Sequence, residues 1–274
     1  MIMSNLLPIV WPKKSNLFGV KVSATDYHEV VRTVIAAGLR RQSAVVTFLP
    51  VHGIVTAAQD QEYRKLINDF EIVAPDGQPV RWALNLFHGA GLEDRVYGPH
   101  AMRRICLRAA QSGIGIYLYG STPDVLKNLS DRLTDWFPTL KIVGMEAPPF
   151  RPLTPEENDA ACQRINASGA GIVFIGLGCP RQDEFAHANR DKIQAVQCCV
   201  GAAFDFHAGN KKMAPEFLQR HGLEWLFRLI QEPRRLWKRY FVTNSLFIGL
   251  CLASVFRLDA QFAKFITPAE GQGA

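Results

Sequence analysis

The sequence predicts an α/β fold, in which a parallel sheet carries helices on both faces and a basic helical appendage follows at the C-terminus. Short runs of β-branched and apolar residues alternate with stretches of helical length, and this alternation is typical of parallel sheets. Polar or glycine-rich turns end several of these runs, and cations gather near the C-terminus. We therefore predict a Rossmann-like domain over residues 1–210 and an appendage over residues 211–274.

The first half of the chain supplies three predicted strands. Ser23 to Asp26 offers side chains that can cap a helix, and the run SAVVTFL is rich in β-branched residues, which favours a buried strand. The turn Pro75-Asp76-Gly77 ends the third strand. In chain order we expect strands at 18–22, 43–49 and 71–74, and helices at 27–39, at about 53–68 and up to about residue 87.

The second half continues the alternation. A strand that ends at Tyr119 leads into Gly120-Ser-Thr-Pro123, where Ser or Thr can cap a helix and Pro can take its first position. A proline-rich loop at 148–155 separates two further strands. We expect strands at 114–119, 140–145, 172–175 and 195–200, and helices at 101–112 and 155–167.

Composition describes a globular protein. Of 274 residues, 48% are hydrophobic and 20% charged. The net charge of +6 and the pI near 9.1 favour phosphates, anionic lipid or nucleic acid as partners without choosing among them. The six cysteines form no CxxC pair, so we expect buried thiols in a reducing compartment and no zinc site. The N-terminus places apolar residues before basic ones, unlike a signal peptide, and we expect a cytoplasmic protein.

The stretch 201–244 concentrates the positive charge. Between Lys211 and Tyr240 lie eight basic and three acidic residues, at the spacing of amphipathic helices, with Pro233 starting a second helix or kinking the first. One interpretation is a solvated basic face. The other is an anion site beside a membrane surface, which arginines favour because the guanidinium matches phosphate oxygens and stays charged.

Five predicted strands end in polar or glycine-rich turns, and such turns meet at one edge of a parallel sheet. Their convergence predicts a ligand site at this edge. The Gly-Leu-Gly at 176–178 is a weak signal alone, because it lacks the third glycine and the later acidic residue of a dinucleotide site. The turns are Thr47 and the segments 75–77, 120–122, 176–183 and 201–205.

Asp76 is the carboxylate that this pattern singles out. An Asp-Gly turn is often structural, since it suits tight turns by itself. Its place at the strand-end edge beside Thr47 favours a general base that takes a proton from an attacking hydroxyl. For Asp205 we favour a structural role, in which its side chain bonds backbone amides of its turn.

Several motif classes are absent from the sequence. It holds no GxxxxGK[ST], which excludes a P-loop, and no Asp-x-Asp, which argues against a metal-dependent nucleotide-sugar site. His52, His100 and His207 have no metal-ligand spacing, and we expect neither a metal nor a cofactor. The charge of a leaving diphosphate would then be met by helix N-termini and arginines.

The chain resembles the WecG/TagA/CpsF family of bacterial glycosyltransferases over roughly residues 18–244. The most specific motifs are GAAFDFHAGNKKMAP and GLEWLFRLIQEPRRLWKRY. The resemblance is also carried by Thr47, Pro75-Asp-Gly77, Arg95-Val-Tyr-Gly98, Tyr119-Gly-Ser121 and the segment GLGCPRQD at 176–183.

The resemblance implies an inverting, metal-independent transfer of a sugar from a UDP-sugar to a polyprenyl-diphosphate-linked acceptor at the inner face of the cell membrane. It implies Asp76 as the general base, with Thr47 beside it. It implies nucleotide contacts from Gly178, Pro180, Gln182 and Asp183, and a diphosphate clamp from Arg228, Arg235 and Arg239. On the same motifs, Arg95, Gly120 and Ser121 are predicted to bind substrate.

Three positions depart from the family pattern. Leu49 stands where the family commonly has Asn, His100 where it has Asp, and Asp183 where it has Glu. The first two changes remove an amide and a carboxylate near the sugar, so the resemblance does not name the sugar that is transferred.

Two alternatives belong to other functional classes. One is a non-catalytic α/β nucleotide-binding module whose basic tail docks a partner protein, and the presence of Asp76 and Thr47 favours the enzyme over it. The other is an RNA-binding protein, suggested by charge and aromatics alone. The sequence lacks an RRM, KH or OB pattern, so we expect no nucleic-acid partner.

The tail is predicted to bind an anionic membrane surface without crossing it. Its apolar run at 245–256 has twelve residues, and a spanning helix needs about 20. Lying flat, the run would bury Leu246, Phe247, Leu250 and Phe256 in the interface while cations meet the headgroups. The alternative is that the run packs on the sheet domain, or on a second copy of the chain in a homo-oligomer.

Overall fold

The computed structural model describes residues 8–256 and is built around a six-stranded sheet in the order β4-β3-β8-β7-β5-β6. Every neighbouring pair in this sheet is parallel. The predicted α/β fold is therefore confirmed. The strands are β3 (Ala44–Leu49), β4 (Ile72–Pro75), β5 (Gly115–Gly120), β6 (Lys141–Glu146), β7 (Ile172–Gly176) and β8 (Val196–Cys199).

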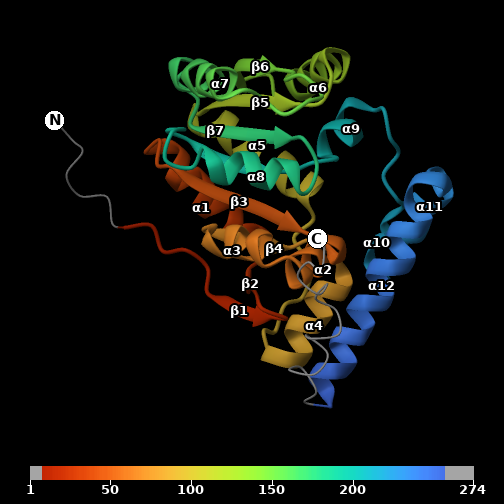
Figure 1. Cartoon of the computed structure of the whole chain (residues 1–274). Helices are drawn as coiled ribbons and strands as arrows, with labels where there is room; N and C mark the ends of the chain where they lie inside the picture. Colours follow the sequence, from red (N-terminus) through yellow and green to blue (C-terminus); the bar gives the residue numbers. More distant parts are fainter. Residues whose placement is uncertain (1–7, 257–274) are drawn as a thin grey trace, which may run out of the picture.

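Helices cover both faces of the sheet, and Figure 1 shows the sheet between the two layers. One face carries α1 (Tyr27–Leu39), α5 (Gly98–Ser112), α6 (Pro123–Trp136) and α9 (Ala203–Ala208). The other carries α2 (Val51–Gln59), α3 (Gln61–Asp69), α4 (Gln78–His88), α7 (Pro155–Ala167) and α8 (Arg181–Ala188).

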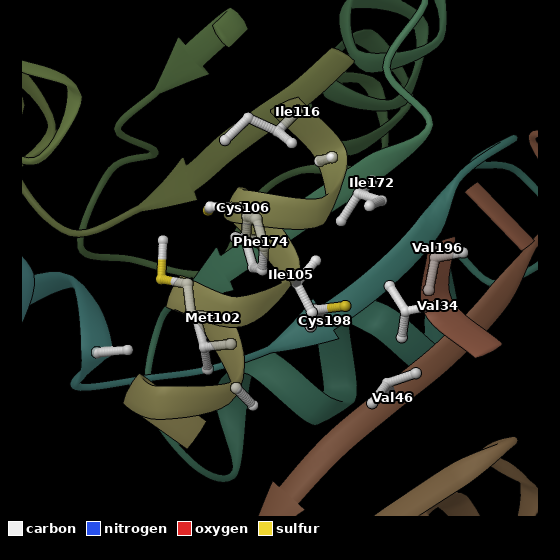
Figure 2. Close-up of a cluster of buried hydrophobic side chains, with 14 of the residues drawn as sticks. Val34, Val46, Met102, Ile105, Cys106, Ile116, Ile172, Phe174, Val196 and Cys198 are labelled. Atoms are coloured by element: carbon white, nitrogen blue, oxygen red, sulfur yellow. The ribbon is translucent and has the colours of Figure 1, made fainter. Parts of the chain in front are cut away.

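The hydrophobic core has one part on each face. Figure 2 shows the part beneath α1 and α5, where Val34 and Ile105 meet Val46 of β3 and Phe174 of β7. These four side chains are fully buried, and each such side chain contributes about 1.5–3 kcal/mol to stability. The two parts together fix where the strand ends lie.

The strand predicted at 18–22 corresponds to β2 (Val20–Ser23), which starts two residues later and pairs in an antiparallel hairpin with the unpredicted strand β1 (Lys14–Leu17). Phe18 and Gly19 form its turn with φ of 55° and 88°, a region that favours glycine and is rare for Phe. The Phe18 ring packs edge-on against Phe247, with 5.6 Å between centroids. This contact anchors the turn against the C-terminal helix.

The single helix predicted at 53–68 is two helices. Asp60 ends α2 and caps α3, since its side chain accepts a hydrogen bond from the Tyr63 N–H at 3.0 Å. The sequence patterns also miss α8 and α9, which have eight and six residues and directly follow strand-end turns.

Between residue 210 and residue 256 the structure has three helices, namely α10 (Glu216–Arg220), α11 (Glu224–Gln231) and α12 (Pro233–Val255). Pro233 starts α12, which settles the choice between a second helix and a kink. In Figure 1, α12 runs past α2 and α4, and it packs against α2. The domain boundary at residue 210 stays a prediction. The ends of the two predicted regions, residues 1–7 and 257–274, lie outside the described residues.

The apolar run at 245–256 packs on the sheet domain, which corrects the expectation that it lies in a membrane interface. Phe247 and Leu250 are 5% and 7% exposed and belong to the core, and Leu246 packs against them. Of the four residues expected in the interface, only Phe256 is largely exposed. Within residues 8–256, no helix combines the length and apolar character needed to cross a membrane.

Candidate active site

The carboxyl ends of the parallel strands open into a cavity of about 710 Å³. The turns after β4, β5, β7 and β8 line it, as the predicted convergence requires. The outer wall comes from α11 and α12, which lie beyond the strand ends in Figure 1. Ligands of open parallel sheets bind at this edge, so this strand-end cavity is the candidate active site.

Nine of the twelve residues predicted for the site line the strand-end cavity. Thr47, Gly120 and Asp183 are buried and do not line it. The nine are Asp76, Arg95, Ser121, Gly178, Pro180, Gln182, Arg228, Arg235 and Arg239.

Asp76 directly follows β4 at the inner wall of the cavity. The Val96 N–H donates to the Pro75 carbonyl at 3.0 Å, which brings the loop with Arg95 against the Asp76 turn. Asp76 is half-buried at this wall. This burial raises the pKa of Asp76 to about 7, although Arg95 lowers it and Glu224 raises it in smaller measure. A pKa near the working pH suits a general base.

Arg95 lies beside Asp76 and is 7% exposed. Its Nη2 donates to Glu224 Oε2 at 2.5 Å and to Gln219 Oε1 at 3.3 Å. The guanidinium also lies over the Tyr97 ring, 4.3 Å from its centroid. No sequence pattern predicts a role for Glu224, because its partner Arg95 lies 129 positions earlier in the chain.

Arg228 on α11 and Arg239 on α12 line the outer wall of the cavity. Arg239 Nε is buried without a hydrogen-bond partner, and the Arg228 guanidinium lies 5.7 Å from the Phe206 ring centroid. Neither arginine forms an ion pair within residues 8–256. Both guanidiniums are thus available to an anionic ligand.

Arg235 differs, because Glu232 pairs with it. Glu232 is also 3.0 Å from Lys211 Nζ, which lies 3.6 Å from Asp205. These ion pairs connect α9, which holds Asp205, to the start of α12. The expected role of Asp205 is corrected: its side chain pairs with Lys211, and its backbone carbonyl accepts the N–H groups of Asn210 and Lys211.

The strand-end cavity therefore combines a carboxyl of near-neutral pKa with arginines free to bind an anion. The family model for the glycosyl transferase WecG/TagA/CpsF family matches residues 15–261. The chain belongs to this family. It is a glycosyltransferase, which acts on a sugar donor and an acceptor, and the interpretation as a non-catalytic module is set aside.

In this WecG/TagA/CpsF glycosyltransferase, Thr47 and Asp183 lie beneath the cavity and bond each other. Asp183 Oδ1 accepts from Thr47 Oγ1 at 2.7 Å, and Oδ2 accepts from the Tyr63 hydroxyl at 2.9 Å. Burial raises the pKa of Asp183 to about 6, and these hydrogen bonds oppose the rise. The pair braces β3 against α8.

Gly120 also lies beneath the cavity and does not line it. A Cβ there would lie 2.7 Å from the Gly176 carbonyl carbon, and the φ of Gly120 is 128°. Only glycine fits this close approach of β5 and β7. The next residue, Ser121, has a φ of 60° and lines the cavity. Such backbone strain costs about 1–3 kcal/mol and is concentrated at functional sites.

Within residues 8–256, five buried polar atoms that lack a hydrogen-bond partner belong to residues that line the cavity. They are His52 Nδ1, Gln78 Oε1, Tyr97 Oη, Gln182 Oε1 and Arg239 Nε. Proteins pair nearly all such atoms, so these are ready hydrogen-bonding positions for a substrate. The site prediction omits His52 and Gln78, although both closely follow strand-end turns.

The departures from the family pattern lie behind the cavity wall. Leu49 is 1% exposed and belongs to the core. His100 packs edge-on against Tyr97, 5.1 Å between centroids, and burial, followed by Arg95, lowers the pKa of His100. Neither residue lines the cavity.

Proposed function

We propose that the protein transfers a sugar from a UDP-sugar to a polyprenyl-diphosphate-linked acceptor in the synthesis of a bacterial surface polysaccharide or exopolysaccharide. The transfer inverts the anomeric carbon and needs no metal ion. The observation that carries the proposal is that Asp76 shares one cavity with Arg228, Arg235 and Arg239. A general base at the edge of the sheet and cations on the outer wall of the cavity are the groups that a direct displacement at the anomeric carbon needs.

In this displacement, Asp76 takes the proton of the acceptor hydroxyl, whose oxygen forms a bond to C1 of the donor sugar. The bond between C1 and the diphosphate oxygen breaks, and its electron pair leaves with UDP. The arginines meet the charge that develops on the diphosphate, and such stabilisation is greatest in the transition state. A single displacement inverts the configuration at C1.

The sheet order supports a division of the cavity into donor and acceptor ends. Asp76 follows the edge strand β4, whereas Ser121 and the turn at 178–182 follow β5 and β7 on the other side of β3 and β8. We place the nucleotide along Ser121, Gly178, Pro180 and Gln182. The acceptor hydroxyl then approaches from the Asp76 end.

The exposed side of the C-terminal helices supports a membrane-bound acceptor. Large apolar side chains are exposed along α11 and α12, and such a surface indicates an interaction site. Exposed cations at Arg234 and Lys238 lie within the same segment. This combination is typical of helices that bind a lipid interface. The protein would act on the cytoplasmic face of the membrane. The outer face, as we define it, comprises Trp225, Leu226, Ile230, Trp237, Phe241, Ile248, Leu252 and Val255.

A panel of radiolabelled UDP-sugars tests the proposal, with purified protein and membrane lipid extract. We expect one donor to label a lipid-linked product, with an inverted anomeric configuration by proton NMR. Labelling from no UDP-sugar contradicts the donor class. A product of retained configuration contradicts the single displacement.

A further inference from the structure

Glu224 is a buried carboxylate at the wall of the strand-end cavity. It has no direct role in the proposed displacement, in which Asp76 is the base. It is 8% exposed and begins α11. Its Oε2 accepts from Arg95 Nη2 at 2.5 Å. A buried ion pair is weak evidence for a stabilising role, because desolvating two charges costs about as much as their attraction contributes.

Arg95 interacts with two carboxylates, Glu224 and Asp76. Burial lowers the pKa of Arg95, but its neighbours, Glu224 first and then Asp76, raise it, and the net pKa is raised. Arg95 in turn lowers the pKa of Asp76. Without Glu224, the full charge of Arg95 would act on Asp76 and stabilise its anion, which would make Asp76 a weaker base.

We propose that Glu224 is a positioning residue, which holds the Arg95 guanidinium in a neutral pair and so leaves the Asp76 carboxylate free to take the acceptor proton. The inference rests on the proposed function, in which Asp76 is the general base. Glu224 needs no contact with the substrate for this role.

The groups around Asp76 are consistent with this assignment. Asp94 accepts from the Arg95 backbone N–H and from Gln78 Nε2, so the carboxylate that pairs with the Arg95 guanidinium is Glu224. Burial raises the pKa values of both nearby tyrosines, which are therefore neutral. The titratable and charged groups that face Asp76, Arg95 and Glu224 are Tyr27 on α1, Asp94 and Tyr97 before α5, His100 on α5, and Arg228 on α11.

Glu224 and Arg228 are one turn apart on α11. Movement of α11 away from the sheet would withdraw Arg228 from the cavity and release Arg95 toward Asp76 in the same step. The basicity of Asp76 and one cation of the anion site thus depend on the same helix.

A ¹³C NMR titration of ligand-free protein, labelled at aspartate carboxyl carbons, measures the effect directly, and Asp76→Asn identifies the Asp76 signal. In Glu224→Gln we expect the pKa of Asp76 to fall by about one pH unit or more. Removal of both charges, by Glu224→Gln with Arg95→Gln, should return it to the wild-type value or above. A merely structural role for Glu224 predicts no such recovery.

Two further variants complete the series. Glu216→Gln, an exposed change on α10 outside the cavity, is the matched control and should leave the Asp76 pKa unchanged. Glu224→Asp keeps the charge on a shorter side chain, so we expect an intermediate pKa, and this variant carries the test if Glu224→Gln does not fold. A wild-type Asp76 pKa in every folded Glu224 variant overturns the proposal.

The pH profile of transfer gives a second readout. In Glu224→Gln the acidic limb of kcat/KM should move to lower pH and the plateau should fall, because the base is weaker. The titration needs no substrate, so the role of Glu224 and the proposed role of Asp76 as the base are tested independently. Transfer that survives Asp76→Asn removes the base assignment, whereas an unchanged Asp76 pKa removes only the role of Glu224.

Discussion

Thr47 Oγ1 lies 2.7 Å from Asp183 Oδ1, and both side chains are fully buried beneath the strand-end cavity. The bond crosses from β3 to α8, and Asp183 also accepts from Tyr63 on α3. One carboxylate therefore holds together three elements that meet under the site.

We expect Thr47→Val to lower the free energy of unfolding by about 1–3 kcal/mol, since the buried Asp183 loses a donor. The dissociation constant for UDP should change little. Urea unfolding and calorimetry measure the two quantities. Thr134→Val, at an exposed position on α6, is the control. Weaker UDP binding at unchanged stability would instead place Thr47 in contact with the ligand.

Asp76→Asn should lower kcat by about 10²–10⁴-fold, because a general base typically contributes that much. Folding and UDP binding should persist, since the amide keeps the shape of the side chain. Circular dichroism and UDP titration check both. Asp159→Asn, at an exposed ion pair with Lys192, should leave turnover unchanged. Wild-type turnover in Asp76→Asn would end the base assignment.

The wild-type enzyme should lose activity as the pH falls through about 7. Burial raises the pKa of Asp76 to about that value, so the carboxyl is protonated below it and able to accept a proton above it. The acidic limb of kcat/KM reports this group in the free enzyme. A limb near pH 4 would mean that water reaches the carboxyl or that another group is the base.

Activity should survive EDTA, because arginines replace a metal at the leaving diphosphate. Arg239→Ala should lower kcat by about 10²–10³-fold, as removal of one transition-state donor does, and Arg235→Ala should act in the same direction. Arg239→Lys keeps the charge without the planar fork and should recover part of the loss. Arg220→Ala, exposed on α10, is the control. Restoration of EDTA-treated enzyme by Mg²⁺ or Mn²⁺ would contradict metal independence.

Trp237→Ser and Phe241→Ser should each weaken binding to anionic liposomes, because both side chains belong to the exposed outer face. High salt should weaken binding further by screening the cations. Leu39→Ser, 57% exposed on α1, is the matched control. Protein that resists a carbonate wash of membranes would be integral, and protein that never binds liposomes would not be a membrane protein.

The sheet is predictable from sequence because strands buried on both faces are continuous apolar runs. The predictions at 43–49 and 172–175 agree with β3 and β7 to within one residue. The β1–β2 hairpin escapes such analysis, since its turn places Phe18 at a positive φ against its intrinsic preference. A tertiary contact with Phe247, far along the chain, stabilises that turn.

The site residues likewise fall into those that the sequence predicts and those that it does not. Asp76 and Ser121 are predictable because they end strands, and their strands share an edge. Thr47 lies within β3, two residues before its end, and its side chain points to the buried side of the strand toward Asp183. The sequence also does not reveal what covers the apolar run that holds Phe247 and Leu250, because hydrophobicity alone does not distinguish a lipid surface from a protein surface.

β8 joins the two halves of the sheet, since it hydrogen-bonds β3 on one side and β7 on the other. During synthesis the ribosome releases β3–β4 and β5–β6–β7 well before residues 196–199 emerge. Until then each half-sheet keeps an open apolar edge, which is prone to pair with wrong partners. The insertion of one four-residue strand closes both edges and unites the strand ends that form the inner wall of the cavity, so the base of the site and protection from aggregation arise in the same folding step.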